Sequence, residues 1–341
     1  MIYNVYWKII NIIYIIIIHI SISYNNHLLL LLNNCKSAND QNQEYLDMCY
    51  KSRNLIYSKQ RNINETDIVT IQDKLNYLMI HESPDYKSKI ADKILLHNYS
   101  VKKLGIDICV PIIKIYNNSE EIKLEDLPDK FVLKCNHGSG MNILCNNKSN
   151  FDLEIAKKNL TQWQSINYGL KKNEFQYINI KRQIFSEIYL KDNLKDYKIY
   201  CFHGVPKFIR VQKKLKDIQG KVNNYYDLNW TLTDIETGIQ GFFRRPDINF
   251  EKPKNFELMI KYSKKLSEDF AFARVDLYNI NGNIYLGEMT FSPSNNMFKL
   301  KNFEQSKEIG KLMFSQKQRI IYLFNFKNYN KIKTIKLKKE E

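Results

Sequence analysis

The chain has 341 residues, with 52 Lys+Arg against 36 Asp+Glu and a formal net charge of +16. Hydrophobic residues make up 44% and charged residues 26%, proportions that exclude a wholly disordered chain. At roughly 100–200 residues per domain, the length allows two or three domains with sizeable cores.

The positive charge is carried almost entirely by lysine, because only eight of the 52 basic residues are arginine. Arginine is the residue of bidentate phosphate and base recognition, so we expect no nucleic-acid partner. The basic stretch at 327–341 is expected to be a solvated tail. Attraction to an anionic membrane surface or an acidic polymer is the alternative.

Six cysteines are scattered along the chain without Cys-x-x-Cys spacing. We therefore expect neither a disulfide framework nor a zinc site, but reduced and mostly buried thiols. The six are Cys35, Cys49, Cys109, Cys135, Cys145 and Cys201.

The first 34 residues are hydrophobic and carry one charge, at Lys8. Their densest apolar part, residues 9–22, is shorter than the roughly 20 residues that span a bilayer, and no small-x-small cleavage site follows it. Three interpretations stay open: a membrane anchor, a secretory signal, and a mis-assigned start, with translation beginning downstream, for example at Met48.

After an ambiguous polar stretch at 39–64, apolar spacing predicts a helix from residue 70 and another over 92–104. In chain order there follow a strand at 110–113, a short acidic helix or loop at 119–127, strands at 131–134 and 142–145, a helix at 151–166 and a strand at 184–190. A hairpin follows at 197–202 and 207–212, then a helix at 253–266 with Asn255 as its N-cap, and a last hairpin at 272–291. This irregular alternation favours a mixed α+β fold with antiparallel hairpins over a doubly wound parallel sheet.

The last hairpin, 272–291, is the most informative segment. Strand side chains alternate between faces, so one face collects Val275, Leu277, Met289 and Phe291, which predicts a core face. The polar residues of the same strands are Arg274, Asp276, Glu288 and Thr290.

The turn decides whether these polar residues share a face. A two-residue turn at Asn281 and Gly282 would put Asp276 and Glu288 on opposite faces. A three-residue loop that pairs Asn279 with Asn283 would gather all the even-numbered residues and set Arg274 opposite Glu288. We expect the three-residue loop, because it also buries the apolar residues together. Two carboxylates then share a face, an arrangement that suits Mg²⁺; a salt-bridged surface face is the alternative.

Lys134 ends a predicted strand and is followed by the small loop 136–140, which contains two glycines. Backbone N–H groups of such a loop can approach phosphate while lysine supplies a point charge. A plain turn is the alternative, and no Walker A pattern is present. Within the loop, His137 could touch phosphate or cap a turn.

Glu187 lies on the strand predicted at 184–190, which leaves a basic segment. The backbone at the end of such a strand can hydrogen-bond an adenine edge, and Glu187 could accept from an exocyclic amine. An ordinary surface glutamate is the alternative. The order of these three segments along the chain is the Lys134 loop, the Glu187 strand and the Arg274 hairpin.

That order resembles the ATP-grasp superfamily, and several strings resemble its TupA-like branch, named for a teichuronopeptide biosynthesis protein. The resemblance runs from about Thr70 to Leu300. The strings are Ala91-Asp92-Lys93, Leu127-Pro128-Asp129-Lys130-Phe131-Val132-Leu133-Lys134-Cys135-Asn136-His137-Gly138-Ser139-Gly140, Asp196-Tyr197-Lys198, Cys201-Phe202-His203-Gly204, Tyr226-Asp227-Leu228-Asn229-Trp230 and Arg274-Val275-Asp276-Leu277-Tyr278.

The resemblance implies roles for particular residues. The ATP-binding residues would be Lys93, Lys134, Asn136, His137, Gly138, Ser139, Gly140, Glu187, Tyr189, Leu190, Asp196 and Lys198. The Mg²⁺ ligands would be Asp276, Glu288 and Thr290, with Arg274 and Lys134 acting in catalysis. Many relatives carry asparagine where this chain has Thr290, which leaves the number of Mg²⁺ ions open.

The resemblance also implies an α+β ATP-grasp fold, with two subdomains gripping ATP between antiparallel sheets. The expected parts are a hydrophobic segment (1–34), a mixed region (35–125), subdomain A (126–190), subdomain B (191–300), and a C-terminal helix with a basic tail (301–341).

The implied activity is an ADP-forming carboxylate–amine ligase that uses ATP and Mg²⁺ and acts through an acyl phosphate. The expected partners are a small-molecule, glycan or peptide carboxylate and an amine, in the synthesis of a cell-surface polysaccharide or teichuronopeptide-type polymer. The expected location is the cytoplasm, at the inner membrane face if the N-terminus anchors it. Three rivals stay open: a metal-independent glycosyltransferase of polysaccharide synthesis, a basic binding module, and an ATP-grasp protein that binds without turnover.

Overall fold

The computed structural model describes residues 69–313, with gaps at 83, 173, 192, 216–219, 239–240 and 295–299. Every described residue belongs to one compact unit, 47–341. The expectations for residues 1–34 and for the basic tail at 327–341 lie outside the described residues. Among the helices that are described, none is long and apolar enough to cross a membrane.

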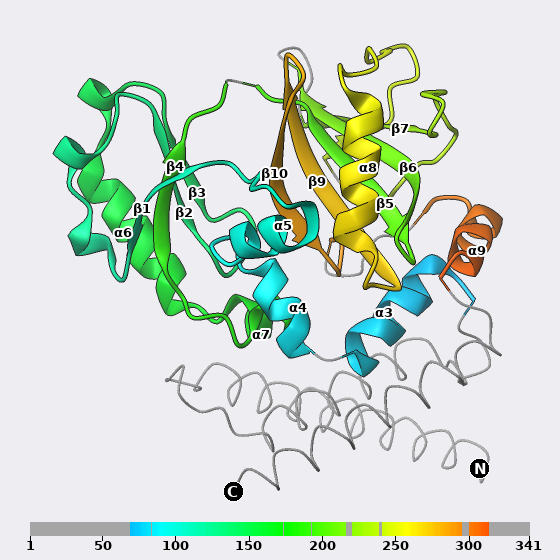
Figure 1. Cartoon of the computed structure of the whole chain (residues 1–341), viewed down its shortest axis with the longest axis horizontal. Helices are drawn as coiled ribbons and strands as arrows, with labels where there is room; N and C mark the ends of the chain where they lie inside the picture. Colours follow the sequence, from blue (N-terminus) through cyan, green and yellow to red (C-terminus); the bar gives the residue numbers. More distant parts are fainter. Residues whose placement is uncertain are drawn as a thin grey trace, which may run out of the picture. The chain divides into compact units, whose positions relative to one another are not determined.

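Two sheets form the framework (Figure 1). The four-stranded sheet has the order β1-β4-β2-β3 and the six-stranded sheet the order β10-β9-β5-β6-β7-β8; every pairing is antiparallel except that of β7 with β8. The strands are β1 (Ile112–Tyr116), β2 (Phe131–Cys135), β3 (Asn142–Cys145), β4 (Ile184–Ile188), β5 (Asp196–Phe202), β6 (Val205–Lys214), β7 (Lys221–Tyr226), β8 (Phe242–Phe243), β9 (Phe272–Ile280) and β10 (Asn283–Thr290). The expected mixed α+β architecture with antiparallel hairpins is confirmed.

Local signals fix the ends of several helices. Thr70 and Asp73 form a capping box at the start of α3, and the Asp152 side chain caps α6. Gly105, with φ of +77°, ends α5 in the left-handed conformation that glycine adopts freely. The helices are α3 (Ile71–His81), α4 (Pro84–Ala91), α5 (Leu96–Leu104), α6 (Leu153–Ser165), α7 (Tyr168–Lys172), α8 (Phe256–Ser267) and α9 (Phe303–Lys311).

One face of the six-stranded sheet is apolar and packs against α8. Met259 and Leu266 of this helix lie in one buried cluster with Ile199, Val211 and Val275 of the sheet. The expected core face of the last hairpin belongs to the same cluster. On the opposite face, apolar residues of α3 and α9 cover only the aromatic part of the sheet around Tyr200 and Phe208. The rest of that second face is polar.

Asn255 was expected to be the N-cap of α8, and the structure confirms the position but not the capping contact. It stands at the N-cap position in a left-handed conformation (φ 57°), and its side chain makes no capping hydrogen bond. Its amide nitrogen instead donates to the carbonyl oxygen of Gly282 at 2.9 Å. The side chain therefore ties the turn of the last hairpin to the start of the helix.

The register of the last hairpin also differs from the expectation. Asn283 pairs with Ile280, so the turn has two residues, Asn281 and Gly282, and not three. The register then shifts at Gly287, and beyond that bulge Glu288 pairs with Asp276 and Thr290 with Arg274. A bulge inserts one extra residue and so turns the following side chains to the other face. The expected gathering of polar residues on one face is present, but the bulge produces it.

Candidate active site

A row of polar side chains crosses the polar face of the six-stranded sheet. Directly opposite residues on neighbouring strands are Glu288 on β10, Asp276 on β9, Lys198 on β5, Arg210 on β6 and Tyr225 on β7. Opposite residues in an antiparallel pair point to the same face. The register therefore places all five side chains on one surface.

Arg274, two residues before Asp276 on β9, holds together the part of this row formed by β9 and β10. Its Nε and Nη2 atoms donate to the two carboxylate oxygens of Asp276 at 2.6 and 2.7 Å. Nη2 also donates to Thr290 Oγ1 at 2.9 Å and to Glu288 Oε1 at 3.3 Å. Oxygen atoms of three residues thus converge on one cationic nitrogen.

Asp276 is held ionised by its neighbours. Burial alone would raise the pKa of this carboxyl, but Arg274 and Lys198 together pull the pKa well below its ordinary value. Lys198 Nζ donates to Asp276 Oδ2 at 2.7 Å and lies 3.7 Å from Asp196. An ionised carboxylate with oxygen neighbours suits a hard divalent cation such as Mg²⁺, so the set Asp276, Glu288 and Thr290 fits that ion chemically.

Lys93 joins the two sheets at this site. Its Nζ donates to the carbonyl oxygen of Gly138 at 2.6 Å and lies 3.9 Å from Glu288 Oε2. Burial lowers the pKa of Lys93, the nearby charge of Lys134 lowers it further, and Glu288 opposes both effects. Lys134 itself pairs with Glu187. Two lysines from separate elements therefore stand close together, an arrangement suited to a polyanionic ligand.

The loop after Lys134 is partly buried. Asn136 is buried, donating to Asp92 Oδ1 at 3.0 Å and to the carbonyl oxygen of Lys181 at 2.9 Å. A Cβ on Gly138 would lie 2.8 Å from the ring of Tyr168. Only Ser139 and Gly140 are exposed. The open part of the loop is therefore its tip.

His137 lies inside this loop. It is fully buried, and its Nε2 lies 3.2 Å from the carbonyl oxygen of Trp163. Burial lowers its pKa to about 4. These contacts are those of a neutral residue that fixes the loop, and they favour the turn interpretation over contact with phosphate.

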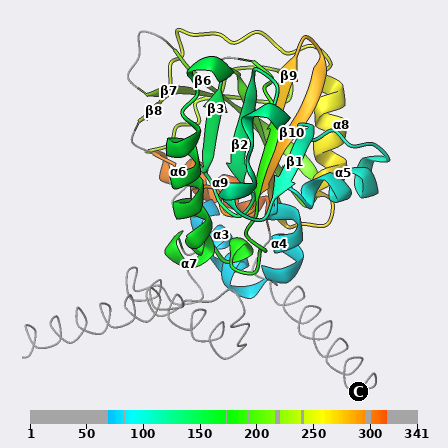
Figure 2. The same cartoon turned by 90° about the vertical axis from the view of Figure 1, so that its left-hand side faces the viewer.

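The expected adenine-side residues lie where β4 leads into β5. Tyr189 and Leu190 are half-buried there, just beyond the end of β4, and Asp196 opens β5 opposite Gln212. A cavity of ≈ 520 Å³ is lined by Asp196, Gln212 and, from the other sheet, Leu144. Residues of the two sheets thus line one hollow beside the strand ends. In Figure 2 the strands β2 and β3 stand in front of β9 and β10.

Comparison with protein-family models supplies the assignment. The model described as TupA-like ATPgrasp matches residues 73–314, which is well over half of the chain. The chain belongs to the TupA-like ATPgrasp family. Its fold is accordingly the ATP-grasp fold.

Several solved structures are similar to this family member. D-alanine–D-alanine ligase from Bacillus anthracis, complexed with ATP, has 15% identity and a TM-score of 0.41, with 76% of this chain and 84% of that chain covered. The ATP-grasp ligase PsnB with its minimal precursor has 10% identity, a TM-score of 0.37 and coverage of 69% and 64%. N5-carboxyaminoimidazole synthetase from Staphylococcus aureus has 15% identity and a TM-score of 0.33, with 59% of this chain and 44% of that chain covered.

The match therefore spans less than two thirds of the PsnB and synthetase chains. Because all three TM-scores lie below 0.5, the family assignment rests on the family model. No curated protein matches the chain.

A buried network beside the last hairpin was not predicted from the sequence. Ser292 Oγ donates to Glu174 Oε2 at 2.8 Å, and Gln176 Nε2 donates to Ser292 Oγ at 2.5 Å. Ser292 follows Thr290 by two residues, a spacing that could have flagged it. Glu174 and Gln176 carry no sequence signal, because they reach the site only through the tertiary fold.

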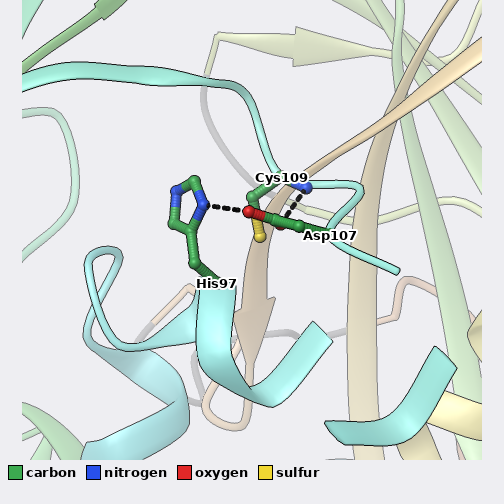
Figure 3. Close-up of side chains that lie close together, drawn as sticks. All are labelled: His97, Asp107 and Cys109. Atoms are coloured by element: carbon green, nitrogen blue, oxygen red, sulfur yellow. Dashed lines mark hydrogen bonds and ion pairs between the residues drawn. The ribbon is translucent and has the colours of Figure 1, made fainter. Parts of the chain in front are cut away.

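A second cluster lies apart from this row, on α5 and the loop that follows it (Figure 3). His97 Nδ1 lies 2.6 Å from Asp107 Oδ2, and the backbone N–H of Cys109 donates to Asp107 Oδ1 at 2.9 Å. Burial raises the pKa of the Cys109 thiol, and Asp107 raises it further. Since the Asp107 carboxylate ties His97 of α5 to the backbone of Cys109 and the thiolate is disfavoured, we interpret the cluster as a brace of the loop before β1.

Proposed function

We propose that the protein is an ATP- and Mg²⁺-dependent carboxylate–amine ligase that acts through an acyl phosphate. The observation that carries the proposal is the convergence of Asp276, Glu288 and Thr290 on the guanidinium of Arg274, opposite Lys93 and Lys134. Family membership supports the nucleotide.

A carboxylate reacts poorly with an amine because oxide is a bad leaving group. Transfer of the γ-phosphoryl group from ATP to a carboxylate oxygen gives an acyl phosphate and ADP. The amine then attacks the acyl carbon, an amide bond forms, and phosphate leaves. The protein contributes positioning and charge neutralisation to both steps.

Different residues of the site contribute different parts of this positioning and charge neutralisation. Lys93, Lys134 and Lys198 neutralise nucleotide phosphates, while the exposed loop tip at Ser139 and Gly140 offers backbone N–H groups. Bound Mg²⁺, held by Asp276 and Glu288 with Thr290 beside them, would offset charge on phosphate oxygens. Arg274, released in part from Asp276, steadies the phosphoryl group during its transfer.

We also propose a class of substrates. The carboxylate and the amine belong to precursors of a cell-surface polysaccharide or a teichuronopeptide-type polymer. The net charge of +16 suits an acidic acceptor of this kind.

Hydroxylamine trapping tests the proposed chemistry. The full-length protein is incubated with ATP, Mg²⁺, hydroxylamine and a panel of amino acids, dicarboxylates and uronic acids. Equal amounts of hydroxamate and ADP are expected with at least one acid, and neither with the Glu288→Gln variant. Release of AMP and pyrophosphate would contradict an acyl phosphate.

A further inference from the structure

Arg210 extends the polar row beyond the residues assigned to ATP and Mg²⁺. It lies on β6, directly opposite Lys198 on one side and Tyr225 on the other. Neighbouring strands lie about 4.8 Å apart, so the Cα of Arg210 is about 10 Å from that of Asp276. The guanidinium is therefore close to the proposed site of phosphoryl transfer, yet two strands away from it.

Arg210 is buried without a counter-ion. Its exposed fraction is 5%, and its Nε has no hydrogen-bond partner. Within the described part of the chain, no carboxylate forms an ion pair with it, although Asp276 lies near enough to affect its pKa. Both oxygens of Asp276 are already bound by Arg274 and Lys198.

Asn223 is a further buried side chain on this face whose polar atoms lack hydrogen-bond partners. It lies on β7 opposite Gln212, diagonal to Arg210, and is 3% exposed. Neither its amide nitrogen nor its amide oxygen has a hydrogen-bond partner. Diagonal neighbours on adjacent strands are about 7–8 Å apart, within reach of an arginine side chain.

The other cations described at the site are buried or half-buried, and each lies beside a carboxylate. Lys198 and Arg274 pair with Asp276, Lys134 pairs with Glu187, and Lys93 lies beside Glu288. Burying a charge without a partner is strongly unfavourable, and so is burying an amide that makes no hydrogen bond. Such violations in a folded chain concentrate at functional positions, where a ligand supplies the missing partner.

We propose that Arg210 and Asn223 form a subsite for a second acidic group on the carboxylate substrate. The guanidinium binds that group as a fork, and the Asn223 amide hydrogen-bonds to a polar group beside it. The inference rests on the proposed ligase function and narrows it: the acid that is phosphorylated carries at least one further carboxylate.

Matched linear acids test this subsite. Glutarate, adipate and pimelate are compared with the monocarboxylates of equal chain length, by thermal shift and calorimetry, with and without Mg²⁺ and a non-hydrolysable ATP analogue. For the full-length protein, at least one dicarboxylate is expected to bind about tenfold more tightly than its matched monocarboxylate. No such preference at any length would overturn the proposal.

Two variants test whether Arg210 and Asn223 cause the preference for a dicarboxylate. Arg210→Gln is expected to abolish it, to melt no lower than the parent protein because an uncompensated charge is removed, and to leave the affinity for the nucleotide within about twofold. Asn223→Asp supplies an internal counter-ion, so it is expected to melt higher and to lose the preference while Arg210 remains. The control Arg245→Gln alters an exposed arginine paired with Asp247 and should change nothing.

The remaining outcomes separate the two proposals. If Arg210→Gln weakens nucleotide binding and keeps the dicarboxylate preference, Arg210 belongs to the nucleotide site and the subsite is refuted. If the parent protein binds no nucleotide but shows an Arg210-dependent preference, the ligase function fails and the acid subsite stands.

Discussion

Arg274 and Asp276 lie two residues apart on β9, and the guanidinium donates hydrogen bonds to both oxygens of the carboxylate at 2.6 and 2.7 Å. Residues at this spacing point to the same face of a strand. The pair is buried, and Lys198 shares the carboxylate. One acidic side chain thus holds two cations in place at the centre of the candidate site.

Replacing Asp276 with asparagine should therefore reduce both stability and function. The change leaves Arg274 and Lys198 buried without their main counter-charge, and we expect the free energy of unfolding to fall by about 3 kcal/mol. Urea unfolding measures this. The matched control Asp247→Asn breaks an exposed pair with Arg245 and should cost under about 1 kcal/mol. Equal effects of the two variants would show that the buried pair has no special role.

Gly287 should be intolerant of larger side chains. It forms the bulge that brings Glu288 and Thr290 to the polar face, and a Cβ there would lie 2.9 Å from the ring of Tyr278. We expect Gly287→Val to cost about 1–3 kcal/mol of stability through overpacking and to weaken nucleotide binding that depends on Mg²⁺. Gly238→Ala, where a Cβ meets nothing within 4 Å, is the control. Full nucleotide affinity in the valine variant would mean that the bulge does not set the register.

His137 should make stability depend on pH. Its pKa falls from 6.5 to about 4 on folding, so the unfolded chain binds the proton more tightly. Stability is therefore complete above pH 6.5 and is lost as the pH falls toward 4; between pH 7 and pH 5 the loss from this group is about 2 kcal/mol. Urea unfolding of the parent and of His137→Gln at both pH values measures it. The variant should lose about 2 kcal/mol less on acidification, and parallel losses would contradict the buried neutral imidazole.

Lys93 should matter more for binding than for folding. Its amine touches the carbonyl oxygen of Gly138 and approaches Glu288 from the other sheet. Lys93→Met is expected to weaken the affinity for an ATP analogue at least about tenfold, because a charge-assisted contact with phosphate is lost. Calorimetry measures this, with the exposed Lys301→Met as control. An unchanged affinity with a lower melting temperature would make Lys93 a structural tether.

Much of the fold could be predicted from local patterns. Strong apolar periodicity located α3, α6 and α8, and alternating residues located β2, β3 and the last hairpin. The short helices α4 and α7 and the strand β7 were missed, because their apolar residues follow no clear period; β7 is mostly lysine, asparagine and tyrosine. The strand expected at 110–113 lies instead at Ile112–Tyr116, since Pro111 has no N–H to donate to a ladder.

The site residues that lie in one sequence motif could be predicted, whereas the contacts between distant segments could not. Arg274, Asp276, Glu288 and Thr290 share a hairpin, so their common face followed from alternation, although the turn was assigned wrongly and the Gly287 bulge was not foreseen. The approach of Lys93 to Glu288 depends on the packing of two sheets. The lack of an ion-pair partner for Arg210 depends on which residues surround it in the folded chain. A single sequence shows neither the packing of the two sheets nor these neighbours.

Nucleotide binding in the presence and absence of Mg²⁺ tests whether Asp276, Glu288 and Thr290 form an ATP and Mg²⁺ site. Calorimetry would compare a non-hydrolysable ATP analogue with UDP-glucose on the full-length protein, on Glu288→Gln and on the exposed control Glu236→Gln, which loses only a contact with Lys301. We expect tight binding of the ATP analogue that requires Mg²⁺, is lost in Glu288→Gln and is kept in Glu236→Gln. Binding of UDP-glucose in preference to the ATP analogue, or binding indifferent to Mg²⁺ and to Glu288, would contradict it.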